Sequence, residues 1–92
     1  MEIVWSSKAI ADNLENISYL LDKWFLEVVL DYEKKIIETE DVLTSNPYAG
    51  EIVGDLSLRR ILVVKQIYLM YEIVGDKILV VRIWNNYKKP YW

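Results

Sequence analysis

Cysteine and histidine are both absent from this 92-residue chain, and each absence excludes a class of functional site. Without cysteine the chain forms neither a disulfide framework nor a thiolate metal site, so a reducing compartment such as the cytoplasm is the expected location. Without histidine, the common zinc ligand sets and every histidine-based catalytic triad are excluded. We therefore expect a protein that works without a metal or a cofactor.

Glycine and proline are also scarce, with three and two residues. None of the glycines belongs to a phosphate-binding loop, and the stretch "NPYAG" is typical of a turn. No segment approaches the roughly 18 consecutive apolar residues that span a bilayer, and the first residues resemble no signal peptide. The sequence thus predicts a soluble cytoplasmic protein with no membrane partner.

Hydrophobic residues are abundant, at 53 % of the chain, and aromatic residues make up 13 %. Such a composition supports a packed interior and argues against disorder. Because 92 residues cannot enclose two separate cores, we expect a single domain over residues 1–92.

Charge is divided unevenly along the chain. Residues 1–55 hold twelve acidic residues and four lysines, a balance of −8. Residues 56–92 hold seven basic and two acidic residues, a balance of +5. Such asymmetry indicates a surface that faces a polyanion. The alternative is that acidic helices only keep one side of the protein soluble.

The first half of the chain has the pattern of a short strand followed by helices. Glu2–Trp5 is rich in strand formers, and the serines that follow are good helix N-caps. Apolar residues then recur in steps of four and three, which predicts two helical faces. The first face contains Ile10, Leu14, Ile17, Leu21 and Trp24, and the second contains Phe25, Val29, Tyr32, Ile36 and Leu43.

The two series do not merge, because Trp24 and Phe25 are adjacent. We therefore expect a break near residues 22–24 and a helical hairpin, with one long helix as the alternative. Polar residues of the first helix are expected in solvent, namely Asp12, Asn13, Glu15 and Asn16. The second helix should end before Pro47, which cannot continue it.

Three β-runs follow, at Leu58–Val64, Ile67–Val74 and Ile78–Trp84, after a loop or poor edge strand near residue 51. Gly75 and Asp76 fit a two-residue hairpin turn. That turn sets four cross-strand pairs, which are Ile73 with Ile78, Tyr71 with Val80, Leu69 with Arg82, and Ile67 with Trp84. Arg82 does not suit this apolar face, so it lies at the rim or a bulge shifts the register.

The order of elements predicts an α+β fold, in which an N-terminal strand and an α-helical hairpin are packed on an antiparallel β-meander as a two-layer sandwich. The predicted interior joins Leu14, Ile17, Leu21, Phe25, Val29 and Ile36 to Tyr71, Ile73, Val80 and Trp84. The opposite sheet face should be partly open and carry Met70, Leu79, Val81 and Ile83.

Basic and aromatic side chains of the second half form the candidate site. The candidates are Arg59, Arg60, Tyr87, Lys88, Lys89 and Tyr91, which antiparallel pairing gathers along one sheet edge. Lysine and arginine contact phosphates, and aromatic rings stack on unpaired bases. The alternative is that these charges only solubilise an edge strand and a tail. Helical acidic pairs such as Glu27 and Asp31 are interpreted as a solvated face.

Several stretches in order resemble the RelE/ParE superfamily of toxins from bacterial toxin–antitoxin modules. They are "LTSNPYAG", "RRILVV" and "YLMYEIVGDKILVVRIW", after a helical pattern that starts at Trp5, and together they cover residues 3–90. The resemblance implies the fold predicted above. Arg60 matches the arginine of the second strand and Tyr71 the tyrosine of the third, whereas Tyr87 stands where many relatives have arginine.

The resemblance leaves three functions open. The first is a ParE-like toxin that inhibits growth by binding a target such as DNA gyrase. The second is a RelE-like endoribonuclease that cuts messenger RNA on the ribosome, with Tyr87 or Tyr91 as base and the arginines and lysines as a clamp. The third is an inactive relative that only binds an antitoxin. All three imply a cognate antitoxin as partner, in a toxin–antitoxin hetero-oligomer.

Overall fold

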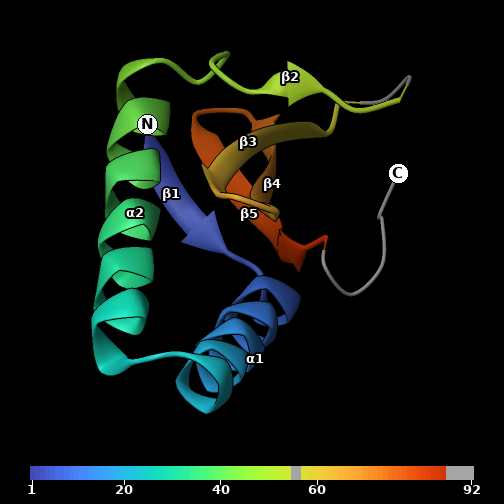
Figure 1. The fold of residues 1–92 in the computed structure, drawn as a ribbon. Helices are drawn as coiled ribbons and strands as arrows, with labels where there is room; N and C mark the ends of the chain where they lie inside the picture. The colour runs from blue at the N-terminus through green and yellow to red at the C-terminus, as the bar shows by residue number, and fades with distance from the viewer. Residues whose placement is uncertain (55–56, 87–92) are drawn as a thin grey trace.

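The computed structural model describes residues 1–54 and 57–86 and shows an α+β fold (Figure 1). The elements are β1 (Glu2–Trp5), α1 (Ser7–Lys23), α2 (Leu26–Ser45), β2 (Glu51–Ile52), β3 (Arg59–Val64), β4 (Ile67–Val74) and β5 (Lys77–Asn85). The predicted fold class is therefore confirmed. Within the described ranges, neither helix has the length and apolar character that crossing a bilayer requires.

The described residues form a sheet of five strands in the order β1-β5-β4-β3-β2. Strands β3, β4 and β5 form the predicted antiparallel meander, and the two-residue β2 pairs antiparallel with β3 at one edge. At the other edge β1 lies parallel to β5, with Glu2 opposite Lys77 and Trp5 opposite Val80. The N-terminal strand thus covers only the first part of β5.

The two helices are separated as the sequence predicts, and one long helix is excluded. Ser6 caps α1, since its Oγ accepts a hydrogen bond from the Ala9 N–H at 3.0 Å. Trp24 and Phe25 are both extended, with ψ of 178° and 162°, and they turn the chain between the helices. In Figure 1, α2 runs beside β1 and α1 lies below the sheet.

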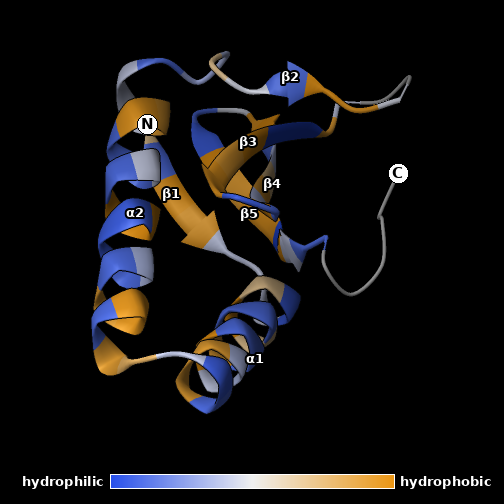
Figure 2. Cartoon of the chain, in the orientation of Figure 1, coloured by the Kyte–Doolittle hydropathy of each residue, from blue (hydrophilic) through white to orange (hydrophobic). Residues whose placement is uncertain are grey.

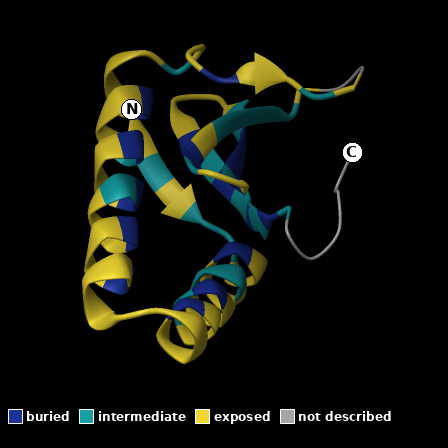
Figure 3. Ribbon diagram, in the orientation of Figure 1, coloured by how far each residue is buried: buried dark blue, intermediate teal, exposed yellow. Residues whose placement is uncertain are grey.

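A buried cluster lies between the helices and one sheet face (Figure 3). Predicted interior positions that are buried there are Val29, Ile36, Tyr71 and Val80, and Ile17 and Ile73 are partly buried against them. Leu43, Leu69, Ile78 and Ile83 complete its centre with no more than 1 % exposure. The interior is therefore formed by α2 and the meander, with a smaller contribution from α1.

The prediction of which side of α1 faces the core is wrong. Leu14 and Leu21 are 61 % and 52 % exposed, and Phe25 beyond the helix is 78 % exposed. The helix instead buries Ala9, Asn16 and Leu20. The physical reason is that polar side chains of this face bond the edge of β5, as described below, so the apolar stripe is turned outward.

The predicted register of β4 with β5 holds only near the turn. Gly75 has a φ of +61°, as a tight hairpin requires, and Ile73 lies opposite Ile78. A bulge between Val80 and Arg82 then shifts the pairing, so that Leu69 faces Ile83 and not Arg82, and Ile67 faces Asn85 and not Trp84.

The bulge also changes which residues lie on the sheet face away from the helices. Ile83 is turned into the core and is 1 % exposed, and Met70 on the far face is fully covered. Trp84, expected in the interior, is only partly buried and lies outside the buried cluster. The alternative that a bulge explains Arg82 is confirmed.

We predict that Leu43→Ala and Leu14→Ala differ strongly in stability. Leu43→Ala leaves a cavity in the core and should lower the free energy of unfolding by about 2–5 kcal/mol. Leu14→Ala should change it by less than about 0.5 kcal/mol, because the side chain is mostly in solvent. Urea unfolding of both variants measures the difference, and equal losses would contradict the orientation of α1.

Candidate functional site

The predicted pair Arg59 and Arg60 lies side by side on β3, but the two side chains reach different partners. The Arg59 Nη1 donates to the Gly50 carbonyl at 2.8 Å, and its guanidinium lies 5.1 Å from the Tyr48 ring centroid. The Arg60 Nε lies 2.6 Å from Glu51 on β2. Each arginine thus holds the chain that precedes the meander, one through a carbonyl and the other through a carboxylate.

Tyr71 fixes the loop between α2 and β2. Its hydroxyl donates to the Pro47 carbonyl at 2.7 Å and accepts from the Gly50 N–H at 2.9 Å. A Cβ at residue 50 would lie 2.7 Å from the Tyr71 ring and 2.8 Å from the Arg60 carbonyl oxygen, so only glycine fits this approach. Burial raises the pKa of Tyr71, which therefore stays a neutral hydrogen-bond donor.

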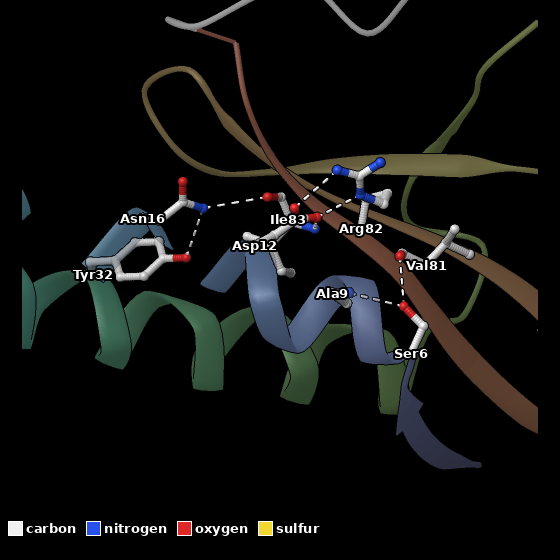
Figure 4. Close-up of polar contacts among 8 residues, drawn as sticks. All are labelled: Ser6, Ala9, Asp12, Asn16, Tyr32, Val81, Arg82 and Ile83. Atoms are coloured by element: carbon white, nitrogen blue, oxygen red, sulfur yellow. Dashed lines mark hydrogen bonds and ion pairs between the residues drawn. The ribbon is translucent and has the colours of Figure 1, made fainter. Parts of the chain in front are cut away.

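Arg82 is bound to α1 by a carboxylate that the sequence pattern places in solvent (Figure 4). Its Nε and Nη2 lie 2.7 and 3.0 Å from the two Asp12 oxygens, which is a bidentate pair. The Asp12 Oδ2 also accepts the Ile83 N–H at 3.1 Å. The aspartate side chain is only 13 % exposed, so the pair is partly desolvated.

Two further side chains of this region bond the same edge of β5 (Figure 4). The Ser6 Oγ donates to the Val81 carbonyl at 2.8 Å, and the Asn16 Nδ2 lies 3.4 Å from the Ile83 carbonyl. Tyr32 connects α2 to α1 in this region, because its hydroxyl donates a hydrogen bond to the Asn13 side chain at 2.7 Å. Burial raises the pKa of Tyr32 to about 12.

The sheet face away from the helices carries two arginines beside two aromatic rings. Tyr68 and Trp84 are cross-strand partners, and Arg60 and Arg82 flank Met70 in the next row. The Arg60 guanidinium lies 5.2 Å from the Tyr68 ring centroid, and the Arg82 guanidinium 4.8 Å from that of Trp84. We call Arg60, Tyr68, Arg82 and Trp84 the arginine–aromatic face.

A groove of about 660 Å³ opens between the corner of the two helices and the turn from β3 to β4. Its walls are mostly apolar and include Trp24, Val28, Leu62 and Val64, with Asp31 and Lys35 among the charged residues. Trp24 and Leu62 are 57 % and 50 % exposed. A concave apolar surface with a few charges is typical of a binding site for a peptide segment.

Comparison with known families assigns the chain. The family model described as "ParE toxin of type II toxin-antitoxin system, parDE" matches residues 3–88. This chain belongs to the ParE toxin family. The match spans nearly the whole sequence and overlaps every element of the fold, so the resemblance to the RelE/ParE superfamily is confirmed.

Solved structures agree with the family in fold. A chain from the chromosomal ParDE toxin–antitoxin system of P. aeruginosa has a TM-score of 0.77 at 23 % identity, with 90 % of this chain and 92 % of that chain covered. A chain from the YoeB dimer of Staphylococcus aureus has a TM-score of 0.64 at 17 % identity, with 90 % and 93 % covered. No curated protein matches the sequence.

The predicted site of this ParE-family chain is described only in part. Arg59 and Arg60 have the positions given above, whereas Tyr87, Lys88, Lys89 and Tyr91 lie outside the described residues. Sequence patterns did not reveal the partnership of Asp12 with Arg82, and the only signal for it was an arginine on an apolar face. Trp84 joins Arg60 and Tyr68 on one face because of the bulge, which is one of the two explanations that the sequence leaves open for Arg82.

Proposed function

We propose that this ParE-family toxin inhibits growth in the cytoplasm by binding a macromolecular target such as DNA gyrase, without a cleavage step of its own. A cognate antitoxin would keep it silent. Family membership supports the toxin role. The choice of binding over cleavage rests on the partners of the arginines.

All three arginines of the sequence bond other groups of the same chain. Arg59 bonds the Gly50 carbonyl, Arg60 pairs with Glu51, and Arg82 pairs with Asp12. A nuclease needs cations that stabilise negative charge as it develops in the transition state. Guanidinium groups that already bond carboxylates and a carbonyl supply less of that stabilisation, which favours a binding protein.

The buried tyrosines agree with this conclusion. A tyrosine base requires a pKa well below its ordinary value of about 10. Burial moves the pKa of Tyr32 and Tyr71 in the opposite direction, so both remain protonated. The candidate bases Tyr87 and Tyr91 lie outside the described residues.

The RelE-like alternative is favoured by one observation, which is the arginine–aromatic face. Two rings and two partly buried guanidinium groups on one sheet face resemble the stacking surfaces on which proteins bind unpaired bases. Under that alternative, Tyr68 and Trp84 would hold messenger RNA on the ribosome, and Lys88 and Lys89 would contact its phosphates.

The first test is induced expression of this chain without its antitoxin, followed by gyrase supercoiling assays and messenger RNA mapping. We expect growth arrest with loss of supercoiling and intact messenger RNA. We also expect Lys88→Ala/Lys89→Ala to relieve the arrest, because these lysines are proposed to contact the target. Lys23→Ala/Lys34→Ala, on the exposed helices, removes the same charge and should remain toxic. Codon-specific cleavage within minutes at normal supercoiling would contradict the proposal.

The antitoxin is proposed to fill the groove beside Trp24 and Leu62. The sheet face that the sequence predicts to be partly open is unsuitable for this role, because Met70 and Ile83 are buried. The groove instead offers apolar walls and both signs of charge to an amphipathic segment that folds on binding.

The second test therefore co-expresses the chain with the product of the adjacent reading frame. Leu62→Asp should reduce co-purification at least about tenfold, since it places a charge in an apolar groove. Ile52→Asp on β2 is the matched control, because Ile52 is 57 % exposed and lies outside the groove lining. Equal capture of both variants would place the antitoxin elsewhere.

A further inference from the structure

An apolar ridge on the outer side of α1 takes part in none of the surfaces described so far. Ile10, Leu14 and Leu21 are each at least half exposed, and the small Ala11 and Ser18 lie exposed beside them. Figure 3 shows the outer side of α1 exposed and the side toward the sheet buried. We call these five residues the α1 ridge.

The spacing of the α1 ridge is that of a helix seam. Ile10, Leu14, Ile17 and Leu21 follow one another in steps of four, three and four, which is the pattern that packs one helix along another. Apart from Ile17, which is partly buried against the core, the seam does not pack inside the molecule, because Asp12 and Asn16 turn the opposite side of α1 toward β5. Ala11 and Ser18 would let a second helix approach closely.

Charged residues beside the α1 ridge indicate which helix can pack on it and in which orientation. Lys8, Glu15 and Asp22 are seven residues apart and follow one flank of α1. A second α1 in antiparallel orientation, with a two-fold axis near Glu15, sets Lys8 of each copy against Asp22 of the other. In a parallel pair the two flanks lie on opposite sides and do not meet.

We propose that the α1 ridge is the contact between two copies of this chain, through antiparallel pairing of their α1 helices. When two copies are related by a two-fold axis, opposite charges face each other along one side of this surface. Its centre is apolar. A helix of 17 residues is only about 25 Å long, so the interface is small and the dimer depends on concentration. Pairing on the outer side of α1 involves no residue of the groove lining or of the arginine–aromatic face.

Sedimentation equilibrium of the purified full chain over a range of concentrations tests the proposal. The wild type should be in monomer–dimer equilibrium, and Leu14→Glu/Leu21→Glu should be monomeric throughout. Ile37→Glu on α2 should dimerise like the wild type, because Ile37 is equally exposed at 60 % but is not on the ridge. A wild type that stays monomeric, or a ridge variant that dimerises normally, would overturn the proposal.

Charge exchange tests the orientation. Lys8→Glu and Asp22→Lys should each weaken the dimer by roughly tenfold, because both ion pairs become like-charge contacts. The double variant restores opposite charges and should return to the wild-type dissociation constant. Failure of the double variant to recover would overturn the antiparallel arrangement. Ridge variants that lose antitoxin binding while self-association is unchanged would assign the ridge to the antitoxin instead.

Discussion

The rest of this fold depends on how the backbone groups along the edge of β5 beyond Val80 find hydrogen-bond partners. Strand β1 pairs with residues 77–80 only. Backbone N–H and C=O groups of a buried strand edge that find no hydrogen-bond partner cost free energy. Side chains of the segment that follows β1 replace the missing strand. Ser6 bonds the Val81 carbonyl, Asp12 the Ile83 N–H, and Asn16 approaches the Ile83 carbonyl.

This solution determines which surfaces remain for function. With its polar side facing β5, α1 adds little to the core, so α2 supplies most of the helical contribution and the α1 ridge faces outward. Figure 2 shows that both helices carry hydrophobic as well as hydrophilic residues. The same carboxylate that bonds Ile83 also holds Arg82. Arg82 in turn lies over the Trp84 ring, so the arginine–aromatic face is tied to the helices and is not an independent cationic site.

Local patterns predicted the elements well and their contacts less well. The break at Trp24, the stop before Pro47 and the turn at Gly75 follow from residues that act on their own neighbours, and the structure contains all three. The face of α1 could not be predicted, because the need for hydrogen bonds at β5 is set by residues about seventy positions away. For the site, Arg60 was predicted, whereas Trp84 was expected in the interior and reaches the face of Tyr68 only through the bulge in β5.

Amide hydrogen exchange at Ile83 tests the central claim, that α1 side chains replace a strand along β5. In Asp12→Ala the Ile83 N–H loses its acceptor, so its exchange should accelerate by about tenfold or more, while residues 77–80 beside β1 stay protected. Asp12→Asn keeps an oxygen acceptor and should lose less protection. If Ile83 in Asp12→Ala exchanges as slowly as in the wild type, the edge does not depend on α1 and the account is contradicted.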